Sequence, residues 1–260
     1  MAKKDIVKKK KNEVVKEAKI NEIDNRDPKF IAAIVILIST IVLVIIVLGG
    51  LYWYFEDKKD VDNKVYDSEK FEKEYESYNG QENSYGGKYL EIDIDSQNVI
   101  KYSSYEEIFS LLENGTGVIY FGFPTCPWCR NLTPALIDAS KEAGIDVIYY
   151  FNNKEDRDIR ELDEDGNIVI TKEGTSDYFK LVEKLEPYLG EYEGLNDNSI
   201  KRLYFPTVVF VKNGKIVDIH IGTVDSQENP SVFLNDEQYK ELKTTLVEKM
   251  EKTIICDDAC

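Results

Sequence analysis

The stretch FGFPTCPWCRNLTPAL, residues 121–136, places two of the chain's four cysteines close together, with only two residues between them. Cys126 and Cys129 follow the apolar run of residues 117–121, whose length and composition are typical of a buried strand. Pro127 comes directly after Cys126, and proline is favoured at the first helical position because an N–H there has no intrahelical partner. The cysteine pair is therefore predicted to lie where a strand passes into a helix.

This position gives the two cysteines different chemistry. At the start of a helix, unpaired backbone amides and the helix dipole stabilise negative charge, so we expect the pKa of the Cys126 thiol to fall. Cys129 comes one turn later and is expected to be less exposed. The pattern predicts a redox dithiol in which Cys126 attacks a disulfide, or accepts one from a thiol, and Cys129 resolves the mixed disulfide.

Two other uses of a cysteine pair fit the sequence less well. A structural zinc site needs roughly four ligands, and the other candidates, Cys256, Cys260 and the single histidine His220, are distant in the sequence. His220 also lies in an alternating strand, where it is expected to point away from the core and to have no catalytic role. A structural disulfide between Cys126 and Cys129 would close a very short loop and constrain little of the chain. The redox use is favoured.

Around the cysteine pair, residues 98–250 alternate between strand and helix patterns. The predicted strands are 99–102, 117–121, 145–151, 207–211 and 215–221, and the predicted helices are 103–112 (capped by Ser103 or Ser104), about 126–143, 177–189 and 235–250. Residues 152–202 form a long insert with a turn at Asp165-Gly166, and Asn213-Gly214 predicts a hairpin. This order predicts an α/β domain with a mixed sheet flanked by helices.

The segments around these elements resemble the thioredoxin superfamily. Pro134 stands five residues after Cys129, where thioredoxins place the proline that kinks the active-site helix. Phe205-Pro206-Thr207 and the following VVFVKNGKIVDIHIG resemble the segment that carries the cis-proline, a hairpin and a later glycine. The resemblance covers residues 98–250 apart from the insert. Within the superfamily, FGFPTCPWC looks most like the bacteriocin transport accessory proteins and related membrane-anchored thioredoxin-like proteins of Gram-positive bacteria.

The resemblance implies roles for residues outside the cysteine pair. The Phe205-Pro206 bond would be cis, and the Phe205 backbone would pair with the substrate backbone as a short added strand. Trp128 would either form an apolar rim for partner proteins or be a tolerated surface residue. Tyr120 occupies the position of the buried acid that helps to deprotonate the resolving cysteine in thioredoxins, and it is expected in the core. The resemblance implies no small-molecule cofactor, since the dithiol is the redox group.

Residues 31–55 contain no charged side chain and are long enough to cross a bilayer as a helix. The run is longer than a typical signal-peptide core and lacks a clear cleavage site, which favours an uncleaved signal-anchor over a cleaved signal peptide. Residues 1–30 hold nine lysines and one arginine against six acids, and positively charged flanks stay in the cytoplasm. The sequence predicts a single-pass cell-membrane protein with a basic cytoplasmic tail and an extracytoplasmic domain.

The part of the chain after the predicted span is strongly acidic. The whole chain carries −16 and residues 1–30 carry +4, so residues 56–260 carry −20. This charge argues against nucleic acid as a partner, because phosphates would be repelled. Residues 56–97 predict an acidic linker or stalk. Residues 251–260 are predicted as a tail, in which Cys256 and Cys260 either exchange electrons with the Cys126–Cys129 pair or are incidental.

These features together predict a membrane-anchored, extracytoplasmic thiol–disulfide oxidoreductase that acts on protein or peptide thiols and disulfides and needs a redox partner protein. The alternative is a non-catalytic accessory module that uses the same fold to bind a secreted peptide or a transport complex. The reactivity of Cys126 towards a thiol reagent separates the two, because a binding module would keep Cys126 inert. The direction of electron flow depends on the reduction potential of the pair.

Overall fold

The computed structural model describes residues 28–84 and 86–254, which fall into a first unit that ends at Asp60 and a second that begins at Val61. Helix α2 (Pro28–Glu76) begins in the first unit. Its segment Pro28–Tyr54 has a mean hydropathy of 3.4 and none of it is buried, so it is long and apolar enough to cross a membrane. The hydroxyls of Ser39 and Thr40 donate to backbone carbonyls one turn earlier, at 2.8 Å each, so both are satisfied within the helix.

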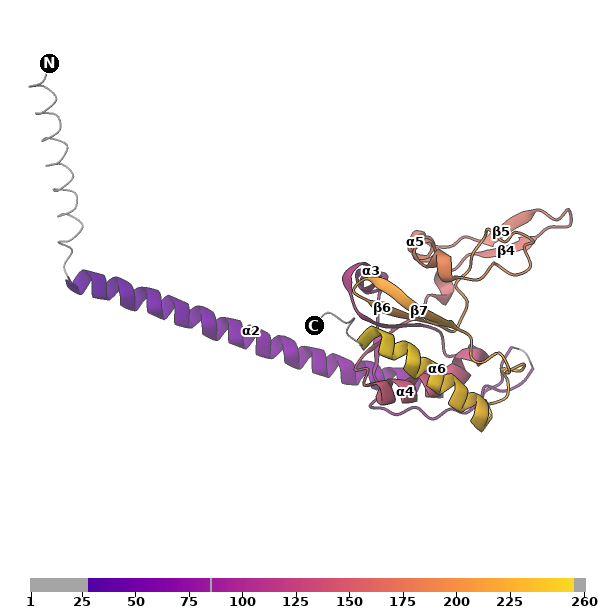
Figure 1. Cartoon of the computed structure of the whole chain (residues 1–260), viewed down its shortest axis with the longest axis horizontal. Helices are drawn as coiled ribbons and strands as arrows, with labels where there is room; N and C mark the ends of the chain where they lie inside the picture. The colour runs from indigo at the N-terminus through magenta and orange to yellow at the C-terminus, as the bar shows by residue number, and fades with distance from the viewer. Residues whose placement is uncertain (1–27, 85, 255–260) are drawn as a thin grey trace, which may run out of the picture. The chain divides into compact units, whose positions relative to one another are not determined.

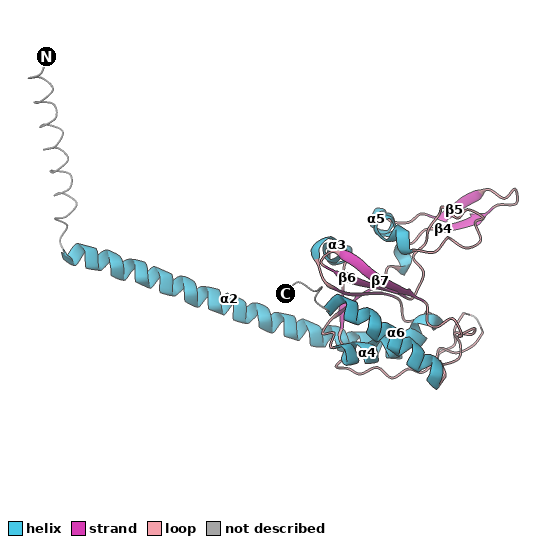
Figure 2. Cartoon of the chain, in the orientation of Figure 1, coloured by secondary structure: helices cyan, strands magenta, loops and turns pink. Residues whose placement is uncertain are grey.

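The second unit is built on a five-stranded mixed sheet with the strand order β1-β3-β2-β6-β7. Its strands β6 and β7 are labelled in Figures 1 and 2. The three strands β1, β3 and β2 are parallel, whereas β6 runs antiparallel to β2 and β7 antiparallel to β6. The bounds are Ile100–Tyr102 for β1, Gly117–Phe121 for β2, Ile148–Phe151 for β3, Thr207–Lys212 for β6 and Lys215–Ile221 for β7. The predicted mixed sheet flanked by helices is confirmed.

Helices cover both faces of this sheet, which explains why β2 and β6 are continuous apolar runs. One core joins the sheet to the end of α2, to α4 (Pro127–Ala143) and to α6 (Asp236–Ile254). The other core joins it to α3 (Tyr105–Asn114) and α5 (Ser176–Leu185). Ser104 caps α3: its side chain accepts from the Glu107 amide, and the Glu107 side chain accepts from the Ser104 amide.

The end of α2 and the segment that follows it belong to the folded domain, so the predicted linker over residues 56–97 is wrong from about Ser68 onward. Phe71, Tyr75, Ile92 and Ile94 are buried in the same core as α4 and α6. Their apolar side chains are spaced widely among charged ones, which is why composition alone reads the segment as a stalk.

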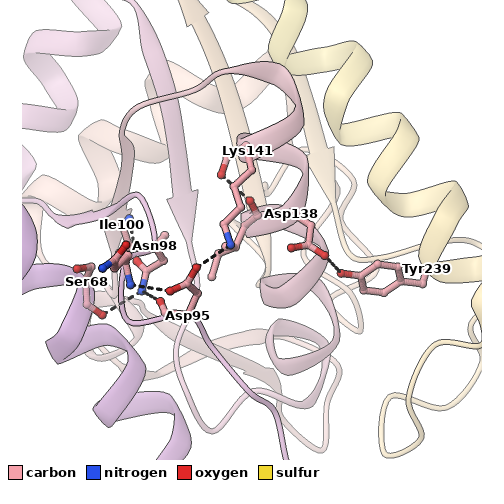
Figure 3. Close-up of polar contacts among 10 residues, drawn as sticks. Ser68, Asp95, Asn98, Ile100, Asp138, Lys141 and Tyr239 are labelled. Carbon is pink, nitrogen blue, oxygen red and sulfur yellow. Dashed lines mark hydrogen bonds and ion pairs between the residues drawn. The ribbon is translucent and has the colours of Figure 1, made fainter.

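Polar contacts fix this segment to the sheet and to α4, as Figure 3 shows. The Asn98 amide donates to the Ser68 carbonyl at 3.0 Å, and its oxygen accepts from the Ile100 amide at 3.0 Å, so one side chain joins α2 to β1. Lys141 of α4 pairs with Asp95 at 2.9 Å. One turn earlier on α4, Asp138 accepts from the Tyr239 hydroxyl of α6 at 2.7 Å.

The insert of residues 152–202 contains more structure than the sequence predicts. After a short 3-10 helix, η1 (Lys154–Asp156), strands β4 (Ile159–Leu162) and β5 (Ile168–Lys172) form an antiparallel hairpin around the predicted turn at Asp165-Gly166. Both strands stay largely exposed, so the alternation that marks a half-buried strand is weak. The predicted helix 177–189 ends as α5 at Leu185 and continues as the 3-10 helix η2 (Glu186–Tyr188), which contains a proline.

Helix α6 runs to Ile254, four residues beyond its predicted end, and it changes the surroundings of His220. Lys249 of α6 donates to Asp218 at 2.5 Å and to the Ile219 carbonyl at 2.7 Å, so the helix covers this part of β7. His220 is half-buried, and its Nε2 atom is buried without a hydrogen-bond partner. The prediction that His220 points away from the core is therefore wrong, because α6 packs over that face of the strand.

Candidate redox site

The two cysteines lie at the amino-terminal end of α4, directly after β2 and its connecting turn. Cys126 is the N-cap residue of α4, and its Sγ accepts a hydrogen bond from the Cys129 amide at 3.2 Å. Pro127 is at the start of the helix, as predicted. Both cysteines are free thiols; 5% of Cys126 and none of Cys129 is exposed. The predicted strand-to-helix position of the pair is confirmed.

The surroundings of the two cysteines shift their thiol pKa values in opposite directions. Burial by itself would raise the pKa of Cys126, but hydrogen bonds from the Cys129 side chain and from the Cys129 and Trp128 amides, with the charge of Arg157, lower it. Burial raises the pKa of Cys129 well above its usual value, and the hydrogen bond and negative charge of Cys126 raise it further. Cys126 is thus the thiol that favours the thiolate.

A backbone edge lies beside Cys126. The Phe205-Pro206 bond is cis, as the resemblance implies. The Phe205 carbonyl accepts from the Cys126 thiol at 3.8 Å, and the Pro206 carbonyl accepts from the Gly222 amide at 2.9 Å. The structure therefore brings together Cys126, Cys129, Phe205 and Pro206. Trp128 is half-buried within the first turn of α4.

Tyr120 lies behind the cysteines and is fully buried, as predicted. Its hydroxyl lies 3.1 Å from the Tyr75 hydroxyl and 3.0 Å from the Thr133 hydroxyl. A hydrogen bond from Tyr120 also opposes the rise in the pKa of Cys129 that burial causes. Gly122 makes room for the ring, because a Cβ there would lie 2.5 Å from the Tyr120 hydroxyl. The buried group next to the resolving cysteine is thus neutral.

Arg130, the residue after Cys129, is a buried cation that sequence reasoning missed. Its guanidinium donates to three backbone carbonyls, of Tyr75 at 2.8 Å, Leu90 at 2.9 Å and Pro124 at 3.0 Å, and to the Asn79 side chain. These contacts join the turn before Cys126 to the segment after α2. Sequence alone offers no signal for the burial of Arg130, because arginine is mostly exposed in folded proteins.

A second group of residues that sequence reasoning missed consists of Phe123 and of two cations from the insert, Lys154 and Arg157. Phe123 and Phe205 meet edge to face with ring centroids 5.2 Å apart, beside Cys126. Lys154 lies over the Phe123 ring at 4.8 Å, and the Arg157 guanidinium lies over the Phe205 ring at 4.3 Å. Two cations from the segment after β3 therefore lie over these two rings, and one of them, Arg157, acts on the Cys126 thiol.

Two predicted site residues lie outside the described part of the chain. Cys256 and Cys260 are beyond the described residues, so their proposed exchange with Cys126 and Cys129 stays a prediction. Within residues 28–84 and 86–254, no group of three or more His, Cys, Asp or Glu side chains is arranged to hold a metal ion. The chemistry that the described residues offer is that of the thiol pair.

Comparison with known proteins adds one structural likeness. No protein-family model matches the chain, and no curated protein matches its sequence. Among solved structures the chain is similar to thioredoxin from Aeropyrum pernix, with 22% identity in a match that covers 58% of this chain and 84% of that chain. The TM-score of the match is 0.31. The description of the site therefore rests on the geometry of this chain.

Proposed function

We propose that the protein is a membrane-anchored thiol–disulfide oxidoreductase that acts outside the cytoplasm on protein or peptide thiols and disulfides. The observation that carries the proposal is the placement of two free thiols at the start of α4, where Cys126 Sγ accepts from the Cys129 amide at 3.2 Å and Cys129 is fully buried. This placement lowers the pKa of Cys126 and raises that of Cys129. An attacking thiol must be deprotonated at neutral pH, and a resolving thiol is best kept protonated until a mixed disulfide has formed. The apolar segment Pro28–Tyr54 supports the anchoring.

The reaction is a pair of thiol–disulfide exchanges. In the reducing direction, the Cys126 thiolate attacks one sulfur of a client disulfide, and the other client sulfur leaves as a thiolate that takes up a proton. Cys129 then loses its proton and attacks Cys126 Sγ, which breaks the mixed disulfide. The client leaves as a dithiol with two more electrons, and the protein gains a Cys126–Cys129 disulfide. A redox partner protein restores the dithiol; with the steps reversed, a client dithiol is oxidised.

The backbone beside Cys126 supports the binding of an extended client. The Phe205 carbonyl lies at the thiol, where it can accept from a client amide as a short added strand pairs with this edge. The ring of Phe205 and the half-buried Trp128 would provide apolar contact on either side. The FGFPTCPWC stretch supports, by resemblance, a task like that of the bacteriocin transport accessory proteins.

Trapping of mixed disulfides tests the proposal. In the Cys129→Ser variant the first exchange proceeds and the second cannot, so client proteins should accumulate on Cys126 as bands that a reductant removes. The Cys126→Ser variant should trap far fewer clients, because Cys129 is fully buried. The variant that lacks both thiols is the background control. Equal trapping by the two single variants would contradict the roles proposed for Cys126 and Cys129.

The alternative, a non-catalytic module that binds a secreted peptide or transport complex, is favoured by one observation: only 5% of Cys126 is exposed. Alkylation with a small thiol reagent distinguishes the oxidoreductase from the binding module. An active dithiol should be alkylated at Cys126 at neutral pH, faster than a free cysteine, because its pKa is lowered. A Cys126 that reacts only after unfolding would favour the binding module.

A further inference from the structure

The insert contains two arginines whose charges are not matched by a carboxylate, and one of them, Arg157, lies beside Cys126. Arg157 lies over the ring of Phe205 at 4.3 Å, and the carbonyl of the same residue is 3.8 Å from Cys126 Sγ. The Arg157 guanidinium donates to the Leu203 carbonyl at 3.3 Å, and its Nε atom is buried without a hydrogen-bond partner. The cation is thus fixed beside the thiol, with part of its donor capacity unused.

Arg202 lies at the other end of the insert and, like Arg157, has unused hydrogen-bond donor capacity. Its guanidinium lies over the Tyr192 ring at 4.1 Å, and its Nε atom is also buried without a partner. Arg202 directly precedes Leu203, the residue that accepts from Arg157. Burial lowers the pKa of Arg157, and the like charge of Arg202 lowers it further, as expected for two cations that are close together.

The carboxylate that could compensate this pair is engaged elsewhere. Asp158 is buried and accepts from Arg160 Nε at 2.5 Å. Across the described part of the chain, no ion pair joins Arg157 or Arg202 to an acid. Both arginines are half-buried, and each has a buried Nε atom without a partner, which is unfavourable. Such a pair, with one member beside a reactive thiol, suggests a binding role.

We propose that Arg157 and Arg202 bind a carboxylate of the client polypeptide close to its reacting cysteine. The inference rests on the proposed function and specifies its clients: cysteines flanked by Asp or Glu. A guanidinium is the side chain best suited to this, because its planar donors match the two oxygens of a carboxylate. The aromatic rings beneath the cations, Phe205 under Arg157 and Tyr192 under Arg202, would exclude water from the contact and strengthen it.

A peptide from this chain's own C-terminal sequence provides a probe of the required chemistry. Residues 255–260 read ICDDAC, with Asp257 and Asp258 between two cysteines. The peptide is used with its two cysteines joined as a disulfide, together with a second peptide in which both aspartates are asparagine. The full chain in detergent is the enzyme, with Cys256 and Cys260 changed to serine so that its own tail does not compete.

The measured quantity is the ratio of the rates at which the two peptides are reduced by one enzyme variant. This ratio is unaffected by the fraction of Cys126 that is deprotonated, since that fraction is common to both peptides. We expect the aspartate peptide to react roughly tenfold faster with the wild-type site at low salt, and the ratio to fall as salt is added. In Arg157→Gln and Arg202→Gln the ratio should approach one.

Lys180→Gln is the matched control, because it removes one positive charge from the insert at a residue paired with Asp177 on α5. The ratio should stay at its wild-type value in this variant. A neutral disulfide, bis(2-hydroxyethyl) disulfide, tests the underlying activity. Equal rates for the two peptides with wild-type enzyme that reduces the neutral disulfide would overturn the carboxylate site and leave the proposed function standing. No reduction of any disulfide would overturn the proposed function itself.

Discussion

At the scale of single residues, the site differs from a thioredoxin-like dithiol with a buried acid in having the neutral phenol of Tyr120 behind Cys129. An acid would accept the proton of the resolving thiol, whereas a phenol with a pKa raised well above its usual value, mainly by burial, does not ionise near neutral pH. It can still donate a hydrogen bond to the developing Cys129 thiolate. Tyr75 and Thr133, which contact the same hydroxyl, orient it.

Replacement of Tyr120 by phenylalanine should therefore slow the second exchange and not the first. The ring and its packing remain, and the lost hydrogen bond, worth about 1 kcal/mol, should slow resolution of the mixed disulfide roughly fivefold. Stopped-flow measurement of the two phases checks this. Tyr150→Phe is the control, because the Tyr150 hydroxyl is buried in the same cluster without a hydrogen-bond partner. A Tyr120→Phe variant with an unchanged second phase would exclude a role for the hydroxyl.

His220 gives a second prediction at this scale. Burial, with the charge of Lys249, lowers its pKa from 6.5 to about 4. The unfolded chain therefore binds the proton more strongly between these values, and the free energy of unfolding should fall by up to about 3 kcal/mol as the pH drops from 6.5 to 4. Below pH 4 this residue causes no further loss.

The chain has one histidine, so a single imidazole signal in an NMR titration measures this pKa directly. Denaturant unfolding at pH 7 and at pH 4.5, compared between the wild type and His220→Gln, measures the corresponding loss of stability. The variant should lose less stability on acidification than the wild type, since the acids are common to both. A titration midpoint near 6.5 would show that α6 does not bury the ring.

At the scale of helices and strands, the sequence predicts an element well where its bounds are set by neighbouring residues. It predicts burial poorly where the contacts are made with residues far away in the sequence. Strand 117–121 and the helix ending at residue 143 have the predicted bounds, because the cap, the apolar run and the turn residues are all local signals. The burial of Phe71 and Tyr75 depends on contact with Tyr150, far along the chain. Amino-acid composition carries no information on such contacts, so it predicts a linker for this segment.

The residues of the candidate site differ in the same way in how well the sequence predicts them. Cys126 and Cys129 were found from their spacing and their place at a helix start. Phe205 and Pro206 were found only by resemblance, since a proline at the start of a strand has no distinguishing local pattern. The cations that the insert brings to the thiol could not be predicted, because their approach depends on how residues 152–202 fold back onto β6.

The burial of the α2 end predicts where a stable domain begins. A fragment that starts at Val61 keeps Phe71, Tyr75, Ile92 and Ile94, whereas one that starts at Asn98 loses four buried side chains worth about 1.5–3 kcal/mol each. Total stabilities are about 5–15 kcal/mol, so the shorter fragment should be largely unfolded.

Circular dichroism and thermal unfolding of the two fragments check this expectation. The shorter fragment also leaves Arg130 without the Tyr75 and Leu90 carbonyls, which adds an unsatisfied buried cation. A fragment of residues 61–254 is the control: it lacks only the part beyond α6 and should melt at the same temperature as 61–260. Equal melting temperatures of the fragments 98–260 and 61–260 would show that the end of α2 does not contribute to the stability of the domain.

At the scale of the whole molecule, charge is divided across the apolar segment: residues 1–30 carry +4 and residues 56–260 carry −20. Positive flanks are retained in the cytoplasm, and the apolar segment Pro28–Tyr54 is long enough to span a bilayer, so the redox site should face outward. Protease added to intact cells should then degrade a tag at the C-terminus and spare a tag at the N-terminus.

A membrane-impermeant thiol reagent provides an independent measurement of the same topology. It should label Cys126 in intact cells in a variant whose other three cysteines are serine, because an outward domain is reached without crossing the bilayer. The same variant with Cys126 also replaced sets the background, and permeabilised cells give the total. A C-terminal tag protected from protease, together with labelling that appears only after permeabilisation, would place the site in the cytoplasm. There the glutathione and thioredoxin systems would keep the pair reduced, and an oxidising role would be excluded.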